Sequence, residues 1–181
     1  MSLTPLTALS PLDGRYHAKV AALSEYFSEY ALIRYRVQVE VEWLKALAAE
    51  PAIAEVPPFS RATAKRLTAE ASGFQAQDAE AVKAIEARTN HDVKAIEYWL
   101  RERLADVPEV QRVTQFIHFA CTSEDINNLC HALMVRDARS QVLLPALDAI
   151  IRQLTTLARD FIVDKPIELP DSVKKFLPMI R

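Results

Sequence analysis

Apolar residues recur at helical spacing along most of this chain, and the first long helix is predicted to begin at Ser28 and to stop before Pro51. One face of this helix carries an apolar stripe with a period of 3.6 residues, formed by Tyr30, Ile33, Val37, Val41, Leu44 and Ala48. Such a stripe is typical of a helix that packs one face into a core. We therefore expect this helix to form part of the core of the chain.

Shorter helices are expected to follow. Ser60 is a candidate cap for a helix that ends near Gly73, and Asp78 for one that runs to about Arg88. The next helix opens in the run 88–94, and its apolar face comprises Val93, Ile96, Leu100 and Leu104. Helical spacing then continues through Val110, Val113, Ile117 and Ala120. In all, about seven helices are predicted between residues 28 and 160, with any strand confined to the ends.

The strongest helix start lies at the centre of the stretch 116–134. Its second half has one apolar stripe, formed by Ile126, Leu129, Cys130, Leu133 and Met134. Thr122 is expected to be the N-cap, and Asp125, three residues on, fits a capping box. Ser123 and two asparagines remain as extra polar groups around the free N–H donors, which favours anion binding. The alternative is a well-capped core helix whose asparagines face water.

A second candidate anion site is the run 88–94. Thr89 and Asp92 stand in the same relation as Thr122 and Asp125, again with surplus polar groups, here Asn90 and His91. A histidine at a helix N-terminus is expected to favour its neutral form, because the helix dipole opposes added positive charge. That form suits a hydrogen-bonding role, although a structural or solvated histidine is the alternative.

The turn 10–17 is the third candidate. Proline and an Asp-Gly pair indicate a turn, and Arg15 and Tyr16 follow at once. A guanidinium fork and a phenol hydroxyl can hold a phosphate or a carboxylate. An ordinary surface turn is the alternative. The other histidines, His118 and His131, are interpreted as core or interface residues.

Composition narrows the class of protein. The chain has 181 residues, half of them apolar, and only two glycines, which favours an all-α fold and excludes a glycine-rich phosphate loop. A net charge of −2 from interspersed charges gives no basic surface for nucleic acid or membrane. No signal peptide or spanning segment is recognisable, so a cytoplasmic protein with a small-molecule or protein partner is expected.

The two cysteines are predicted to be reduced thiols rather than parts of a metal site or a disulfide. Cys121 and Cys130 lie nine residues apart without a CxxC motif. Cys121 is the more reactive candidate, because a helix N-terminus can favour a thiolate. No histidine is placed as its obvious base, which weakens a nucleophilic role.

Together these segments resemble the adenylosuccinate lyase family, in its longer bacterial form, within the fumarase/aspartase superfamily. The resemblance extends from about residue 4 to about residue 160 and is carried by SPLDGRY, RTNHDVKAIEY and FIHFACTSEDINN. Fumarase-like and argininosuccinate lyase-like chains have different residues around the TS motif and lack the SPLDGRY turn. The resemblance implies an N-terminal helical domain followed by the start of a long-helix bundle.

The resemblance also implies an activity. The family eliminates fumarate from adenylosuccinate to give AMP, and from the succinylocarboxamide ribotide of purine synthesis, as a homotetramer with shared active sites and without a metal or organic cofactor. The residues that match its substrate-binding positions are Arg15 and Tyr16 at the phosphate, Asn90, His91 and Asp92 in a binding segment, and Thr122 and Ser123 at the succinyl group.

The resemblance predicts residues 1–107 as the N-terminal domain, 108–160 as the first part of the bundle, and 161–181 as a tail foreign to the family. The segment with the general-acid histidine and the loop with the catalytic serine have no match here, so no catalytic residue is assigned and the chain alone is expected to be inactive. An interrupted gene, a frameshift or an engineered piece would each give this pattern. The alternative function is a non-catalytic helical module for interaction or oligomerisation.

Overall fold

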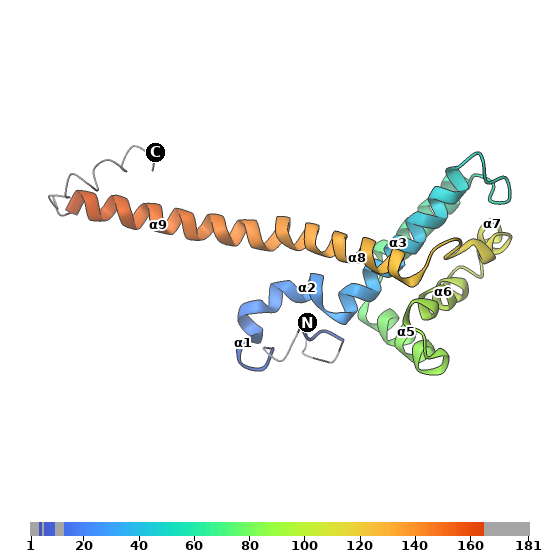
Figure 1. Cartoon of the computed structure of the whole chain (residues 1–181), viewed down its shortest axis with the longest axis horizontal. Coiled ribbons are helices and arrows are strands. Elements are labelled where there is room, and N and C mark those ends of the chain that lie inside the picture. Colours follow the sequence, from blue (N-terminus) through green and yellow to red (C-terminus); the bar gives the residue numbers. More distant parts are fainter. Residues whose placement is uncertain (1–3, 5, 10–12, 165–181) are drawn as a thin grey trace. The chain divides into compact units, whose positions relative to one another are not determined.

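A computed structural model of the chain describes residues 4, 6–9 and 13–164, and these residues are helical with no strand (Figure 1). The all-α prediction is confirmed. The elements are α1 (Asp13–Val20), η1 (Ala21–Leu23), α2 (Ser24–Phe27), α3 (Glu29–Ala49), α4 (Arg61–Ser72), α5 (Ala76–Thr89), α6 (Asp92–Arg103), α7 (Pro108–Gln111), η2 (Thr114–Phe116), α8 (Ser123–Ala138), the π-helical turn η3 (Arg139–Leu143) and α9 (Leu144–Asp164).

Helix α3 lies at the centre of the first of two compact units, residues 1–139, and packs against α4, α5, α6 and α8. Its predicted stripe is buried in the larger core, with Leu67 of α4, Val82 of α5 and Ile96 of α6. A second face of α3, with Tyr35 and Val39, packs against α8 through Ile126, Cys130 and Met134. A helix that packs on two faces has apolar residues nearly all round.

The helix starts follow local hydrogen bonding. Ser28 and Ser60 cap α3 and α4, and their hydroxyls accept hydrogen bonds of 3.2 Å from the backbone N–H groups three residues on. The predicted start at Asp78 is wrong by three residues. Gln75 is the N-cap of α5, and Asp78 is the third helical residue, whose carboxylate accepts from the Gln75 backbone N–H at 2.8 Å. A carboxylate suits both positions, which is why the sequence pattern was ambiguous.

The helical spacing predicted through residues 110–120 does not give a continuous helix. A turn at residues 112–113 separates the short α7 from η2. Between η2 and α8, residues 118 and 120 adopt left-handed backbone angles that a right-handed helix cannot hold. The four apolar residues of this spacing have different environments: Val110, Val113 and Ile117 are buried, and Ala120 is exposed.

The second compact unit, residues 140–181, is described through α9, whose first turn holds Pro145. Six large apolar residues of α9 are more than half exposed: Leu147, Ile150, Ile151, Leu154, Leu157 and Phe161. Most of the predicted tail, residues 165–181, lies outside the described residues. The predicted domain boundary near residue 107 refers to the family fold and stays a prediction.

Candidate functional site

The start of α8 has the capping geometry that the sequence predicted. The Thr122 hydroxyl accepts from the Asp125 backbone N–H at 3.3 Å, and the Asp125 carboxylate accepts from the Thr122 backbone N–H at 2.7 Å. The hydrogen bond from the backbone N–H of Thr122 holds the pKa of Asp125 below its ordinary value, helped by the Thr122 hydroxyl. Thr122 is exposed and Ser123 is half-buried in the first turn. The cap therefore leaves polar groups of this turn open to a ligand.

The start of α6 is capped by His91. Its imidazole Nδ1 accepts a 3.1 Å hydrogen bond from the backbone N–H of Lys94, so in this geometry the ring proton is assigned to Nε2. A neutral ring that can donate from Nε2 is the form predicted from the sequence. The predicted cap at Thr89 is wrong, because Thr89 is the last residue of α5 and its hydroxyl donates back to the Ile85 carbonyl at 3.2 Å.

A buried arginine of α3 links these two helix starts. Nη2 of Arg36 donates to Oδ2 of Asp92 at 2.6 Å, and its Nε donates to Oδ1 of Asn127 in α8 at 3.0 Å. Burial raises the pKa of Asp92, but the hydrogen bond from the Val93 backbone and the charge of Arg36 outweigh it and hold this pKa below its ordinary value. Arg36 thereby brings together two motifs that are separate in the sequence.

Left-handed backbone angles precede both helix starts. Within the described residues, the non-glycine residues with positive φ are Asn90 at 51°, His118 at 65° and Ala120 at 58°. Asn90 stands directly before the cap of α6, and the other two stand within four residues of the cap of α8. Such angles are costly for residues other than glycine and asparagine, and they persist where surrounding contacts hold them.

Residues 10–12 of the third predicted segment lie outside the described residues, and residues 13–17 lie in α1. Tyr16 is 41% exposed there, and the side chain of Arg15 lies outside the described residues. Asp13 begins α1 as a buried residue, and its carboxylate accepts from the Leu9 backbone N–H and lies 3.3 Å from Nδ1 of His17. The Asp13-Gly14 pair, which was predicted to form a turn, instead begins helix α1.

A family model described as a lyase matches residues 14–163. The chain belongs to this lyase family. Curated relatives are adenylosuccinate lyases: that of Escherichia coli strain K12 is 54% identical over 158 residues, covering 87% of this chain and 35% of the relative. The enzyme of Vibrio cholerae is 52% identical over 161 residues, covering 89% and 35%, and that of Buchnera aphidicola from Acyrthosiphon pisum is 40% identical over 154 residues, covering 85% and 34%.

The lyase chain spans about a third of the length of these curated relatives. The resemblance drawn from the three motifs is confirmed, and the chain corresponds to an N-terminal part of an adenylosuccinate lyase. Among the helices described, none is long and apolar enough to cross a membrane.

Sequence reasoning missed three residues of α3 whose side chains hydrogen-bond to the site: Arg36, Glu40 and Trp43. Their spacing of four and three residues places them on one helix face, and the two charged residues on a long apolar helix were the available signal. Glu40 contacts His118, which confirms that this histidine is satisfied internally. His131 is exposed on α8 and is therefore not a core residue of this chain, whereas its interpretation as an interface residue stays a prediction.

The cysteines of this lyase chain are poor nucleophiles. Burial raises the pKa of Cys121, and the nearby carboxylates of Glu40 and Asp125 raise it further, so the thiolate predicted at this helix start is disfavoured. Burial raises the pKa of Cys130 to about 12. In the part of the chain that the structure describes, no cluster of three or more histidine, cysteine or acidic side chains could hold a metal ion.

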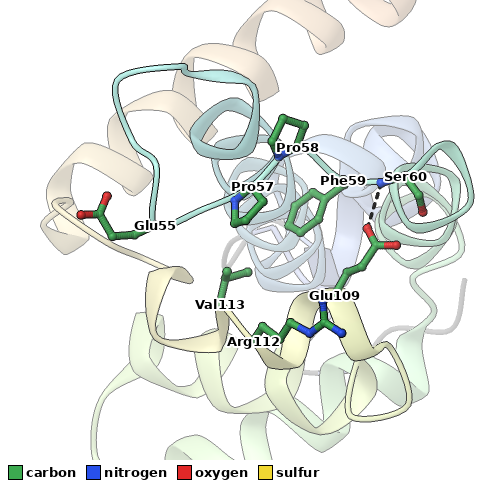
Figure 2. A pocket seen from close by; sticks show the side chains of 8 residues that line it. All are labelled: Glu55, Pro57, Pro58, Phe59, Ser60, Glu109, Arg112 and Val113. Atoms are coloured by element: carbon green, nitrogen blue, oxygen red, sulfur yellow. Dashed lines mark hydrogen bonds between the residues drawn. The ribbon is translucent and has the colours of Figure 1, made fainter.

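Several hollows lie on the described residues of the first unit of the lyase chain. The one that includes Arg36 and Asp92 measures about 300 Å³ and also has His131 in its wall. An apolar groove of about 540 Å³ runs between α3 and α8, past Trp43 and Leu129. Figure 2 shows a third, of about 500 Å³, lined by Glu55, Pro57, Pro58, Phe59, Ser60, Glu109, Arg112 and Val113. None of the predicted site residues lines this last pocket, where Glu109 accepts from the Ser60 backbone N–H at 2.8 Å.

Proposed function

We propose that this chain supplies the substrate-binding part of an adenylosuccinate lyase that eliminates fumarate from adenylosuccinate, giving AMP, and from the succinylocarboxamide ribotide. The observation that carries the proposal is the Arg36 bridge, because it fixes the start of α6 and the start of α8 to one helix. At the start of α8, Thr122 and Ser123 place neutral hydrogen-bonding groups beside the first backbone N–H groups, a setting that favours anions. At the start of α6, the backbone N–H groups of Val93 and Lys94 are bonded to Asp92 and His91, so the imidazole of His91 is the group proposed to meet the substrate. The substrate carries a phosphate and two carboxylates.

The residue roles follow from the family motifs and are part of the proposal. Arg15 and Tyr16 bind the phosphate. Asn90, His91 and Asp92 form a binding segment in which the Nε2–H of His91 donates to the substrate and Asp92 is held by Arg36. Thr122 and Ser123 hold the succinyl group. No metal or organic cofactor takes part, and the intact enzyme is a cytoplasmic homotetramer.

The chemical step needs groups beyond these residues. A base must remove the proton next to a succinyl carboxylate, and an acid must protonate the departing nitrogen, each contributing about 10²–10⁴-fold. The 181 residues contain no match to the family's histidine or serine segments for these roles. Residues 1–107 and 108–160 are therefore assigned to a binding domain and the start of a bundle that other segments and subunits complete.

Fragment complementation tests this function. The chain is refolded with the remainder of the Escherichia coli adenylosuccinate lyase, and fumarate release from adenylosuccinate is followed by absorbance. We expect the mixture to release fumarate and each fragment alone to show only background. Thr122→Ser, which keeps the cap and the hydroxyl, retains activity, whereas Thr122→Asn keeps the cap and loses activity.

Two results would contradict the proposal. A complemented mixture in which Thr122→Asn stays fully active would remove Thr122 from the substrate. Activity of the chain alone that is abolished by His91→Ala would make His91 an acid or base rather than a binding residue.

A second candidate, a non-catalytic assembly module, is favoured by the exposed apolar stripe on α9. Mixing the chain with the intact Escherichia coli enzyme and measuring size by sedimentation separates the two candidates. Mixed oligomers without any gain of activity in fragment complementation support the module, whereas restored activity supports the enzyme.

A further inference from the structure

Two side chains of α3 reach the turn that precedes α8. Oε1 of Glu40 and Nδ1 of His118 share a hydrogen bond of 2.6 Å, and Nε1 of Trp43 donates to the backbone carbonyl of Phe119 at 2.9 Å. Because residues 40 and 43 lie three positions apart on a helix, both side chains leave the same face of α3. The turn is therefore attached to α3 at two consecutive residues.

Glu40 is buried at a position where an ionised carboxylate costs desolvation free energy. The residue is 0% exposed, and its second oxygen, Oε2, has no hydrogen-bond partner. Burial raises the pKa of Glu40, and the hydrogen bond with His118 offsets only part of that effect. Replacing both members of a buried pair of this kind by apolar residues of similar volume is often neutral or stabilising. Stability alone therefore does not explain a carboxylate here.

The turn itself is strained. His118 and Ala120 have φ of 65° and 58°, and Phe119 between them is 46% exposed and adds little burial to hold the turn. Alanine gains nothing from the left-handed region, because it has no side chain that could hydrogen-bond locally. Such a conformation persists only where outside contacts fix it. The contacts from Glu40 and Trp43 are of that kind.

We propose that Glu40 and His118 are positioning residues, whose hydrogen bond holds the turn 117–121 so that Thr122 and Ser123 face the succinyl group of the substrate. Neither residue needs to touch the substrate. The inference rests on the proposed function for the roles of Thr122 and Ser123. The held conformation of the turn can be measured without any reaction.

Amide hydrogen exchange of the 181-residue chain is the primary test. His118→Ala is expected to speed exchange of the Thr122 and Asp125 amides by about tenfold, the scale on which one hydrogen bond contributes, and to leave the amides of α6 unchanged. His118→Asn tolerates positive φ and keeps an amide N–H, so exchange should return to within about threefold of the original chain. His131→Ala, an exposed histidine on α8, is the matched control and should change neither region.

Glu40→Leu separates positioning from stability. Glu40→Leu leaves His118 without its partner and also removes the unpaired Oε2, so exchange at Thr122 and Asp125 should quicken by about tenfold as in His118→Ala, while exchange in α6 stays unchanged whatever the shift of the urea midpoint. Glu40→Gln keeps an acceptor for His118 and should exchange like the original chain. Unchanged exchange at Thr122 in Glu40→Leu, or equal quickening throughout α6, would overturn the positioning role.

Succinate serves as the probe for ligand binding at Thr122 and Ser123. Titration of the original chain should shift the Thr122 and Ser123 amide resonances, and His118→Ala should weaken the fitted affinity by about threefold to tenfold, the scale of a lost hydrogen bond. Equal affinity of the two chains would overturn the link between the turn and the ligand. If succinate shifts no amide resonance of the original chain, the result counts against the proposed function. The hydrogen-exchange comparison tests separately whether Glu40 and His118 hold the turn 117–121.

Discussion

Nη2 of Arg36, in the middle of α3, donates a 2.6 Å hydrogen bond to Oδ2 of Asp92, the first residue of α6. The arginine side chain is 8% exposed and the aspartate side chain 45%, so the pair lies at the edge of the core. Nε of the same guanidinium binds Asn127 in α8. Lysine has no planar fork and cannot reproduce two such directed contacts. In this geometry, Arg36 hydrogen-bonds directly to both helices near their starts.

Replacing Arg36 should loosen both helix starts. Arg36→Met leaves Asp92 and Asn127 without their donor and is expected to lower the free energy of unfolding by about 2–3 kcal/mol, as measured by urea titration. Arg36→Lys should recover less than half of that loss. Arg61→Met, at an exposed arginine on α4, is the control and should stay within about 0.5 kcal/mol. Similar losses for both methionine variants would contradict the bridge.

Asp92→Asn tests the same pair through pH. The pKa of Asp92 lies below its ordinary value of 3.8, so its contribution is present above that value and is lost as the pH falls through the lowered pKa. We expect Asp92→Asn to cost about 1 kcal/mol at pH 7, discounted for solvent screening, and the difference to shrink as the pH falls below 3.8. Urea titrations at pH 7 and at a series of pH values below 3.8 measure it. Asp148→Asn, exposed on α9, should show no such dependence.

The cap of α8 can be removed without touching the core. Thr122→Ala deletes the hydroxyl that accepts from the Asp125 backbone N–H and donates to its carboxylate at 2.8 Å. It should destabilise the chain by about 1 kcal/mol, whereas Thr122→Ser should stay within a few tenths. Thermal unfolding followed by circular dichroism measures both variants. Equal stability of the alanine and serine variants would mean that the cap does not operate in solution.

The two thiols should differ in reactivity. Burial raises the pKa of Cys130 to about 12, and the side chain is completely buried, so a disulfide reagent at pH 8 should not label it in the folded chain. Cys121 is only partly buried and should react, though more slowly than a free thiol, because its pKa is also raised. Both should react in urea. Mass spectrometry of labelled peptides distinguishes them, and fast labelling of Cys130 without urea would contradict its burial.

The stripe on α9 should cause self-association. Leu147, Ile151 and Leu154 are each more than half exposed, an unusual state for a run of large apolar side chains. Sedimentation velocity is expected to show concentration-dependent oligomers, and Ile151→Lys combined with Leu154→Lys should shift them toward monomer. Gln153→Lys adds a charge on the same helix outside the stripe and is the control. A monomer at all concentrations would contradict the expected association.

Much of the fold could be predicted because its signals are local. The start of α8 at Thr122, the start of α4 at Ser60 and the end of α4 before Gly73 each depend on hydrogen bonds within three or four residues of the chain. The apolar stripe of α3 could also be predicted, because it follows from the 3.6-residue spacing of apolar residues along that segment. Errors arose where two polar residues could serve one cap, as with Thr89 and His91 at the start of α6.

The sequence by itself determined an all-α chain with two polar helix starts and the motifs of a lyase family. The reason is that helical periodicity and helix caps depend on residues close together along the chain. Only the tertiary structure decided which polar residues hold those starts. Arg36 and Asp92 are 56 positions apart, and Glu40 and His118 are 78 apart. Such pairs form only when folding brings α3 against α6 and against the turn before α8, so no pattern along the chain specifies them.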